Sequence, residues 1–97
     1  MSDQNYLLSV ILCTYNRAAL LQRALETLCH QTLSTTEYEV IVVDNRSTDE
    51  TAKVVEDFRQ RLPNLRYCLE TEQGISRARN HGWSMAQGGY VAFSDDD

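Results

Sequence analysis

Three short runs of apolar residues have the pattern of buried parallel strands. They cover residues 7–13, 39–43 and 90–93, and their apolar side chains follow one another with little alternation. Such runs are typical of strands that are covered on both faces, as parallel strands are. A further strand is predicted at residues 65–69, nearer an edge of the sheet, because Arg66 interrupts its apolar run.

Segments with helical periodicity separate these strands. The first covers residues 18–31. The second begins after Ser47, because Ser47 and Glu50 have the spacing of a capping box, and Pro63 and Asn64 end it. The third covers residues 76–86, and residues 87–89 turn the chain into the last strand. The side chains expected to face the sheet are Leu21, Ala24, Leu25 and Leu28 in the first helix, Val54, Val55, Phe58 and Leu62 in the second, and Ala78, Gly82, Trp83 and Ala86 in the third.

The resulting order, βαβαβαβ, predicts an α/β fold with an open, Rossmann-like parallel sheet. Right-handed crossovers lead us to expect strand order 3-2-1-4. In such sheets the ligand binds beyond the carboxyl ends of the strands where the order reverses, which is between the first and fourth strands. The segments expected to carry the chemistry are therefore residues 14–17, 44–47, 71–79 and 95–97, all of them polar.

Length, charge and cysteine content narrow the class of protein. The 97 residues are enough for one small domain, residues 1–97, with a single core. Nine basic and fourteen acidic residues give a net charge of −5, which argues against a nucleic-acid groove. Cys13, Cys29 and Cys68 lie far apart among apolar neighbours, which favours buried thiols in a reducing compartment. The sequence shows no signal-peptide pattern, so we expect a cytoplasmic location, with membrane association of a longer polypeptide left open.

Three carboxylates, Asp95, Asp96 and Asp97, directly follow the last predicted strand. Clustered carboxylates repel one another unless a cation compensates their charge, and oxygen ligands favour hard cations such as Mg²⁺ or Mn²⁺. The alternative is a solvated acidic tail, but no flexible spacer separates the triplet from the strand. An ending at this point also suggests a truncated domain.

Four motifs, in order along the chain, resemble those of the family 2 glycosyltransferases of the GT-A type. They are SVILCTYNR at residues 9–17, VIVVDNRSTDET at 40–51, GISRARN at 74–80 and YVAFSDDD at 90–97. The last is similar to the strand that leads into the metal-binding DXD motif of that family. One such motif would be weak evidence, whereas four in order make a chance match improbable. The resemblance implies a partial GT-A fold that ends at DXD.

The resemblance also implies which residues bind a nucleoside diphosphate sugar. Asp44 is expected to accept a hydrogen bond from a base N–H, although a plain turn acid is the alternative. Thr14 and Tyr15 are expected to frame the base or ribose, with Arg17 near the opening of the first helix. Asn45 stands where this family often has an acidic residue, and we assign it a binding role as well.

An arginine and the terminal acids complete the expected site. Arg79 lies where its guanidinium can reach a phosphate or a donor carbonyl. The alternative is a surface ion pair of Arg79 or Arg77 with Glu70 or Glu72. By the resemblance, Asp95 and Asp97 are the outer acids of DXD and the metal ligands, with Asp97 the preferred direct ligand of Mn²⁺ or Mg²⁺. Asp96 or Asp95 then faces the ribose, and the register among the three identical residues stays open.

We therefore expect the donor-binding part of an enzyme that transfers a hexose-type sugar from a nucleoside diphosphate to an acceptor hydroxyl. The family resemblance implies inversion by direct displacement, with a general base that lies downstream of DXD. No residue of this chain matches that base, so the chain itself is expected to be inactive in transfer. The fourth strand is expected to expose a sheet edge and to promote self-association.

The sequence leaves two alternatives to this function. The first is a stand-alone nucleotide-binding or regulatory module. The second is a dinucleotide-dependent oxidoreductase, which is disfavoured because the first strand is followed by the sequence TYNR rather than by a glycine-rich fingerprint.

Overall fold

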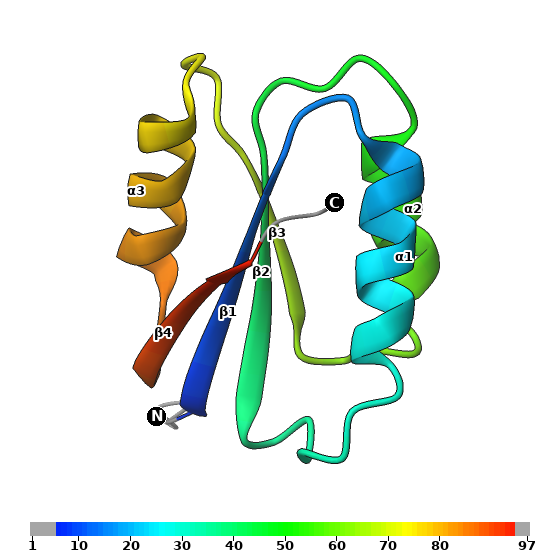
Figure 1. Cartoon of the computed structure of the whole chain (residues 1–97), viewed down its shortest axis with the longest axis vertical. Helices are drawn as coiled ribbons and strands as arrows, with labels where there is room; N and C mark the ends of the chain where they lie inside the picture. Colours follow the sequence, from blue (N-terminus) through cyan, green and yellow to red (C-terminus); the bar gives the residue numbers. More distant parts are fainter. Residues whose placement is uncertain (1–5, 95–97) are drawn as a thin grey trace.

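The computed structural model describes residues 6–94, and in them four strands alternate with three helices (Figure 1). The predicted order of elements and the predicted bounds of the third strand are confirmed. The elements are β1 (Tyr6–Thr14), α1 (Ala18–Leu28), β2 (Tyr38–Asp44), α2 (Thr51–Phe58), β3 (Leu65–Leu69), α3 (Ile75–Met85) and β4 (Gly88–Ser94).

The four strands form one parallel sheet in the order β3-β2-β1-β4, as predicted. Helices α1 and α2 cover one face of this sheet and α3 covers the other (Figure 1). The register places Thr14 beside Asp44, and Asp44 beside Leu69, so the carboxyl ends of β1, β2 and β3 meet at one edge. Ser94, the last residue of β4, pairs with Leu12 near the same edge.

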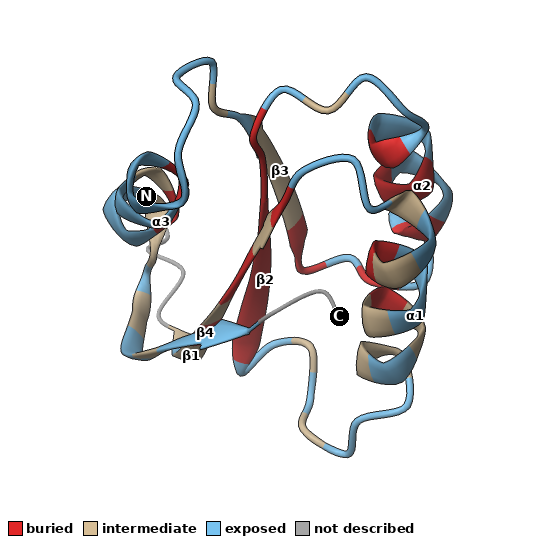
Figure 2. Ribbon diagram, turned by 45° about the horizontal axis from the view of Figure 1, so that its top comes forward, coloured by how far each residue is buried: buried red, intermediate tan, exposed pale blue. Residues whose placement is uncertain are grey.

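The hydrophobic core consists of two layers, one on each face of β2. Every residue of β2 is buried, which Figure 2 shows as a continuous red strand. The larger layer contains Leu21, Leu25 and Phe58 and lies under α1 and α2. The smaller layer contains Ile11, Ile41 and Ala78 and lies under α3. Gly82 allows α3 to approach this closely, because a Cβ on it would come within 2.5 Å of the Ile11 side chain.

Several helix boundaries differ from the prediction, and α2 ends at Phe58, before the Pro63 and Asn64 that were expected to end it. Helix α1 ends at Leu28, three residues earlier than expected. Helix α2 begins at Thr51, and the predicted capping box of Ser47 and Glu50 is wrong because Glu50 is the N-cap and makes no side-chain cap bond. Ser47 instead accepts a hydrogen bond from the backbone N–H of Asn16, so a contact between loops takes the place of a helix cap.

The α3 and β4 region is more exposed than predicted. Trp83 was expected to face the sheet, but 60% of it is exposed and its ring stacks on Phe93 at a centroid separation of 6.3 Å. Strand β4 was expected to be covered on both faces, yet its residues are exposed or only partly buried. Both predictions were wrong because β4 lies at an end of the described sheet, where apolar side chains have fewer neighbours.

A buried carboxylate connects the four strands at the opposite, amino-terminal edge. Glu39 is fully buried and accepts hydrogen bonds from the Ser9 hydroxyl and from the backbone N–H of Gln87, each at 2.6 Å. Arg66 forms an ion pair with the other carboxylate oxygen at 2.9 Å and also donates to the backbone carbonyl of Met85. The arginine that interrupts β3 therefore compensates a buried charge at the point where α3 turns into β4.

Within residues 6–94, no helix is both long enough and apolar enough to cross a lipid bilayer.

We expect Arg66→Met to lower the free energy of unfolding by about 2 kcal/mol, because it leaves the Glu39 charge buried without its cation. Arg59→Met removes a solvent-exposed ion pair with Glu56 and should cost less than about 0.5 kcal/mol. Urea denaturation of both variants at neutral pH measures the difference. Equal destabilisation by the two substitutions would contradict the role assigned to Arg66.

Candidate functional site

The loops after β1, β2 and β3 are bound to one another at the carboxyl edge of the sheet. The backbone N–H of Asn45 donates to the Thr14 carbonyl at 2.9 Å, and that of Glu70 donates to the Asp44 carbonyl at 2.8 Å. These bonds continue the strand pairing one residue beyond the strands. The three loops therefore leave the sheet side by side. The sequence predicted the site at this edge, beyond the carboxyl ends of the strands.

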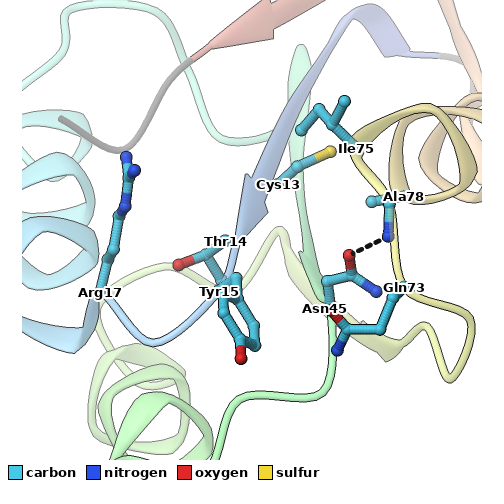
Figure 3. A pocket seen from close by; sticks show the side chains of 9 residues that line it. Cys13, Thr14, Tyr15, Arg17, Asn45, Gln73, Ile75 and Ala78 are labelled. Atoms are coloured by element: carbon cyan, nitrogen blue, oxygen red, sulfur yellow. Dashed lines mark hydrogen bonds between the residues drawn. The ribbon is translucent and has the colours of Figure 1, made fainter.

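A pocket of about 310 Å³ lies between these loops and the first turn of α3. Figure 3 shows Thr14 and Tyr15 between Arg17 on one side and Asn45 on the other. The structure thus brings together four of the residues that the sequence predicted. The pocket lining consists of Cys13, Thr14, Tyr15, Arg17, Asn45, Gln73, Gly74, Ile75 and Ala78, and it includes neither Asp44 nor Arg79.

Asp44 holds the turn that follows β2. Only 2% of the residue is exposed, and its two carboxylate oxygens accept from the Ser47 backbone N–H at 2.9 Å and from the Tyr67 hydroxyl at 2.6 Å. Burial, and then the hydrogen bond to Asp44, raises the pKa of the Tyr67 phenol well above its usual range. This geometry agrees with the alternative of a turn acid. Each oxygen keeps a second lone pair, so the predicted bond from a base N–H to Asp44 stays a prediction.

Asn16 joins the first and second loops through both its backbone and its side chain. Its backbone N–H donates to the Ser47 hydroxyl at 2.9 Å, and its side-chain oxygen accepts from the Thr48 backbone N–H at 2.7 Å. Asn16 and Arg46 both have positive φ, at 52° and 66°, a conformation that asparagine tolerates better than most residues. Sequence reasoning did not identify this contact, since nothing in a linear pattern pairs residues about thirty positions apart.

Asp49 makes the second connection between these loops. One of its carboxylate oxygens accepts from the Ala18 backbone N–H at 3.0 Å, and the other accepts from the Thr51 backbone and hydroxyl. Its carboxylate therefore binds the first turns of both α1 and α2. Partial burial works to raise the pKa of Asp49, but hydrogen bonds from Thr51 and Ala18 outweigh it and hold this pKa below the usual value.

Asn45 fastens the third loop to the end of β2. Its side-chain amide donates to the carbonyls of Glu70 and Glu72 at 3.2 and 2.8 Å, and its side-chain oxygen accepts from the Gly74 N–H at 3.1 Å. Figure 3 draws the bond that the Asn45 side-chain oxygen accepts as a dashed line. Gly74 has φ of 128°, which favours glycine at this residue before α3.

The two arginines of α3 differ in their contacts. Arg77 lies 3.8 Å from Glu72, which is the surface ion pair that the sequence left as an alternative. Arg79 instead lies over the Phe93 ring, with its guanidinium carbon 5.9 Å from the centroid. Glu70 pairs with His81 at 3.0 Å. The predicted phosphate contact of Arg79 stays a prediction.

The predicted metal ligands Asp95 and Asp97, and Asp96 between them, lie outside the described residues. Within residues 6–94, no group of three or more His, Cys, Asp or Glu side chains is placed to hold a metal ion. The predicted metal site at these three carboxylates, which follow β4 directly in the sequence, stays a prediction.

A profile of the family described as Glycosyl transferase family 2 matches residues 9–97. The chain belongs to glycosyl transferase family 2. Validoxylamine A glucosyltransferase of Streptomyces hygroscopicus is 44% identical to the chain over 91 residues, which cover 92% of this chain and 21% of the relative. The family 2 chain thus spans about a fifth of the length of that relative.

Solved structures agree with the family in fold. The chain matches S. aureus TarS 1-349 in complex with UDP-GlcNAc with a TM-score of 0.87 and 38% identity, over 93% of this chain and 26% of that one. It also matches the mannosyltransferase PcManGT of Pyrobaculum calidifontis, in complex with GDP-Man and Mn²⁺. The TM-score is 0.87 and the identity 34%, over 94% of this chain and 27% of that one. The predicted GT-A architecture of this family 2 chain is therefore confirmed, over its partial length.

We expect Asp49→Asn to lower the free energy of unfolding by about 1 kcal/mol at neutral pH, because an amide has one acceptor oxygen and cannot accept from both Ala18 and Thr51. The pKa of Asp49 in the folded chain lies below its ordinary value of 3.8, so the stabilisation is complete above that pH and is lost as pH falls through the folded pKa. The parent and the variant should therefore converge in acid. Thermal unfolding from pH 7 to pH 2 measures this.

Asp57→Asn is the matched control, because within residues 6–94 Asp57 makes only an exposed ion pair with Lys53. A difference between the parent and Asp49→Asn that stays constant into acid would overturn the assignment to the Asp49 carboxylate.

Proposed function

We propose that this chain is the donor-binding part of a glycosyltransferase that takes a sugar from a nucleoside diphosphate and transfers it to an acceptor hydroxyl. One observation carries the proposal: Thr14, Tyr15, Arg17 and Asn45 line a single pocket at the carboxyl edge of the sheet. The similarity to a solved UDP-GlcNAc complex supports it. Titration with UDP, GDP and dTDP distinguishes the nucleoside of the donor.

In this proposal the parts of the donor meet different residues. Thr14 and Tyr15 frame the base or the ribose, because Thr14 ends β1, Tyr15 follows it, and both line the pocket. Asp44 accepts from a base N–H through a lone pair that its internal bonds leave available. Arg17 and Arg79 supply positive charge toward the diphosphate, with Arg79 leaving its contact with Phe93 to do so.

The proposed cation is Mn²⁺ or Mg²⁺, held by Asp95 and Asp97, with Asp96 or Asp95 facing the ribose. The fit rests on the chemistry of the donor set, since three carboxylates follow a strand whose last residue pairs near the carboxyl edge. A bound divalent cation would neutralise the negative charge that develops on the departing diphosphate. The Mn²⁺ complex of the mannosyltransferase supports this choice of metal.

Transfer of the sugar requires more than this pocket. The acceptor oxygen attacks the anomeric carbon as the bond to the diphosphate breaks, with inversion, and a general base removes the acceptor proton. No residue of the chain matches that base by the family resemblance. We propose that the longer polypeptide is the enzyme and that the chain of 97 residues binds the donor without transferring it.

Isothermal titration of the chain with UDP, GDP and dTDP, each with Mn²⁺ or with EDTA, tests the proposal. We expect weak, metal-dependent binding. Asp97→Asn should remove the metal dependence, whereas Tyr15→Ala should weaken the nucleotide about tenfold if the base stacks on that ring. Tyr90→Ala removes an exposed tyrosine on β4, outside the pocket, and serves as the matched control. The proposal would be contradicted if no nucleotide bound at millimolar concentration, or if the affinity were the same with Mn²⁺ and with EDTA.

We also propose that the chain self-associates through β4. This strand lies at one end of the sheet order and carries exposed Tyr90 and Phe93. Sedimentation velocity should show a concentration-dependent dimer that Tyr90→Lys and Phe93→Lys weaken. Leu69→Lys, on the other edge strand, is the control and should have a smaller effect. A monomer at every concentration would refute the association.

The proposed compartment is the cytoplasm. Cys13, Cys29 and Cys68, all within residues 6–94, form no disulfide with one another. Burial raises the pKa of the Cys68 thiol to about 11, so it stays protonated and unreactive at neutral pH.

A further inference from the structure

The Asn45 side chain uses nearly all of its hydrogen-bonding capacity on one loop. It is 7% exposed, and its three hydrogen bonds go to the carbonyls of Glu70 and Glu72 and to the N–H of Gly74. A carboxamide has two N–H donors, and both are engaged here. Asn45 lies at the pocket wall, but its polar atoms are directed at residues 70–74.

The geometry explains why an amide is present where a carboxylate is expected. A carboxylate accepts hydrogen bonds and cannot donate them, so it would place a negative oxygen against the carbonyl oxygens of Glu70 and Glu72. It would keep only the bond from the Gly74 N–H. The arrangement of residues 70–74 therefore depends on the nitrogen of Asn45 and not merely on the size of its side chain.

We propose that Asn45 is a positioning residue, which sets the wall of the donor pocket by holding residues 70–74 against the end of β2. This inference rests on the proposed function only for the identity of the ligand. The loop supplies Gln73 and Gly74 to the pocket, and Ile75 follows it as the first residue of α3. A substitution of Asn45 is consequently expected to change ligand binding by moving these pocket residues.

A second contact holds the same loop from the side of α3. Glu70 accepts from the backbone N–H of Glu72 at 2.8 Å and pairs with His81 at 3.0 Å. This contact stabilises the start of the loop, whereas the hydrogen bond from the Gly74 N–H to Asn45 stabilises its end. Loss of Asn45 should therefore loosen the loop near the pocket without unfolding the domain.

Amide exchange measured by NMR without any nucleotide tests the inference directly. In the parent chain, the Gly74 amide and the Asn45 side-chain NH₂ should be protected from exchange. Asn45→Ala and Asn45→Asp should both speed exchange at Glu72 and Gly74 by about tenfold, the equivalent of one lost hydrogen bond. Exchange in the Asp variant should be as fast as in the Ala variant, because an aspartate side chain also lacks the two N–H donors.

The matched control is Asn64→Asp, which changes another buried asparagine whose amide donates to a backbone carbonyl, that of Tyr38. It should lower overall stability and leave Glu72 and Gly74 exchange as in the parent. Rapid exchange of Gly74 in the parent, or an Asn45→Asp variant with parental exchange, would overturn the inference. If a variant fails to fold, the exchange rate of Gly74 in the parent still tests whether Asn45 holds the loop.

Titration of the parent and Asn45→Asp with UDP and Mn²⁺ links the loop to the ligand. We expect the variant to bind UDP about tenfold more weakly, in step with its faster exchange. Equal affinity despite a loosened loop would refute the role in the pocket. If the parent itself fails to bind UDP, GDP and dTDP, the proposed function fails, while the exchange data still decide the role of Asn45 in the loop.

Discussion

The carboxylate of Glu39 has no contact with solvent, so the protein itself must supply every group that compensates its charge. These groups come from Ser9 in β1, Arg66 in β3 and the backbone of Gln87 before β4. The contacts bind the amino-terminal ends of the strands to one another. A shift of β4 along β1 would separate Gln87 from Glu39. The buried charge thereby helps to fix the register of β4 along β1.

Close approach of backbones supports the same arrangement. A Cβ on Gly88 would come within 2.6 Å of the Ser9 backbone nitrogen, so the first residue of β4 must be small where it passes β1. The Gly88 N–H also donates to the Ser9 hydroxyl at 2.8 Å. Glu39, Ser9 and Gly88 thus form one polar junction at the end of the sheet opposite the pocket.

At the carboxyl edge, side chains that look like binding residues also hold the protein's own loops. Asp44 closes the turn after β2, Asp49 binds the starts of two helices, and Asn45 holds the loop before α3. Their hydrogen-bonding groups are largely directed at backbone. The pocket lining is left to neighbours that these bonds position, such as Tyr15 and Gly74. The order of the loops, and with it the shape of the pocket, therefore depends on these few polar residues.

The sequence by itself determined the order of elements, the strand order and the edge at which the polar loops meet. Apolar runs and helical periods are local signals, and right-handed crossovers leave few ways to arrange them. The same local reasoning misplaced Trp83 and the cap of α2, and it treated Glu39 as part of an apolar run. Only the tertiary structure decided which polar residues hold loops and which line the pocket. Those roles depend on partners far apart in sequence, such as Asn16 with Ser47 and Asn45 with Gly74, that no linear spacing specifies.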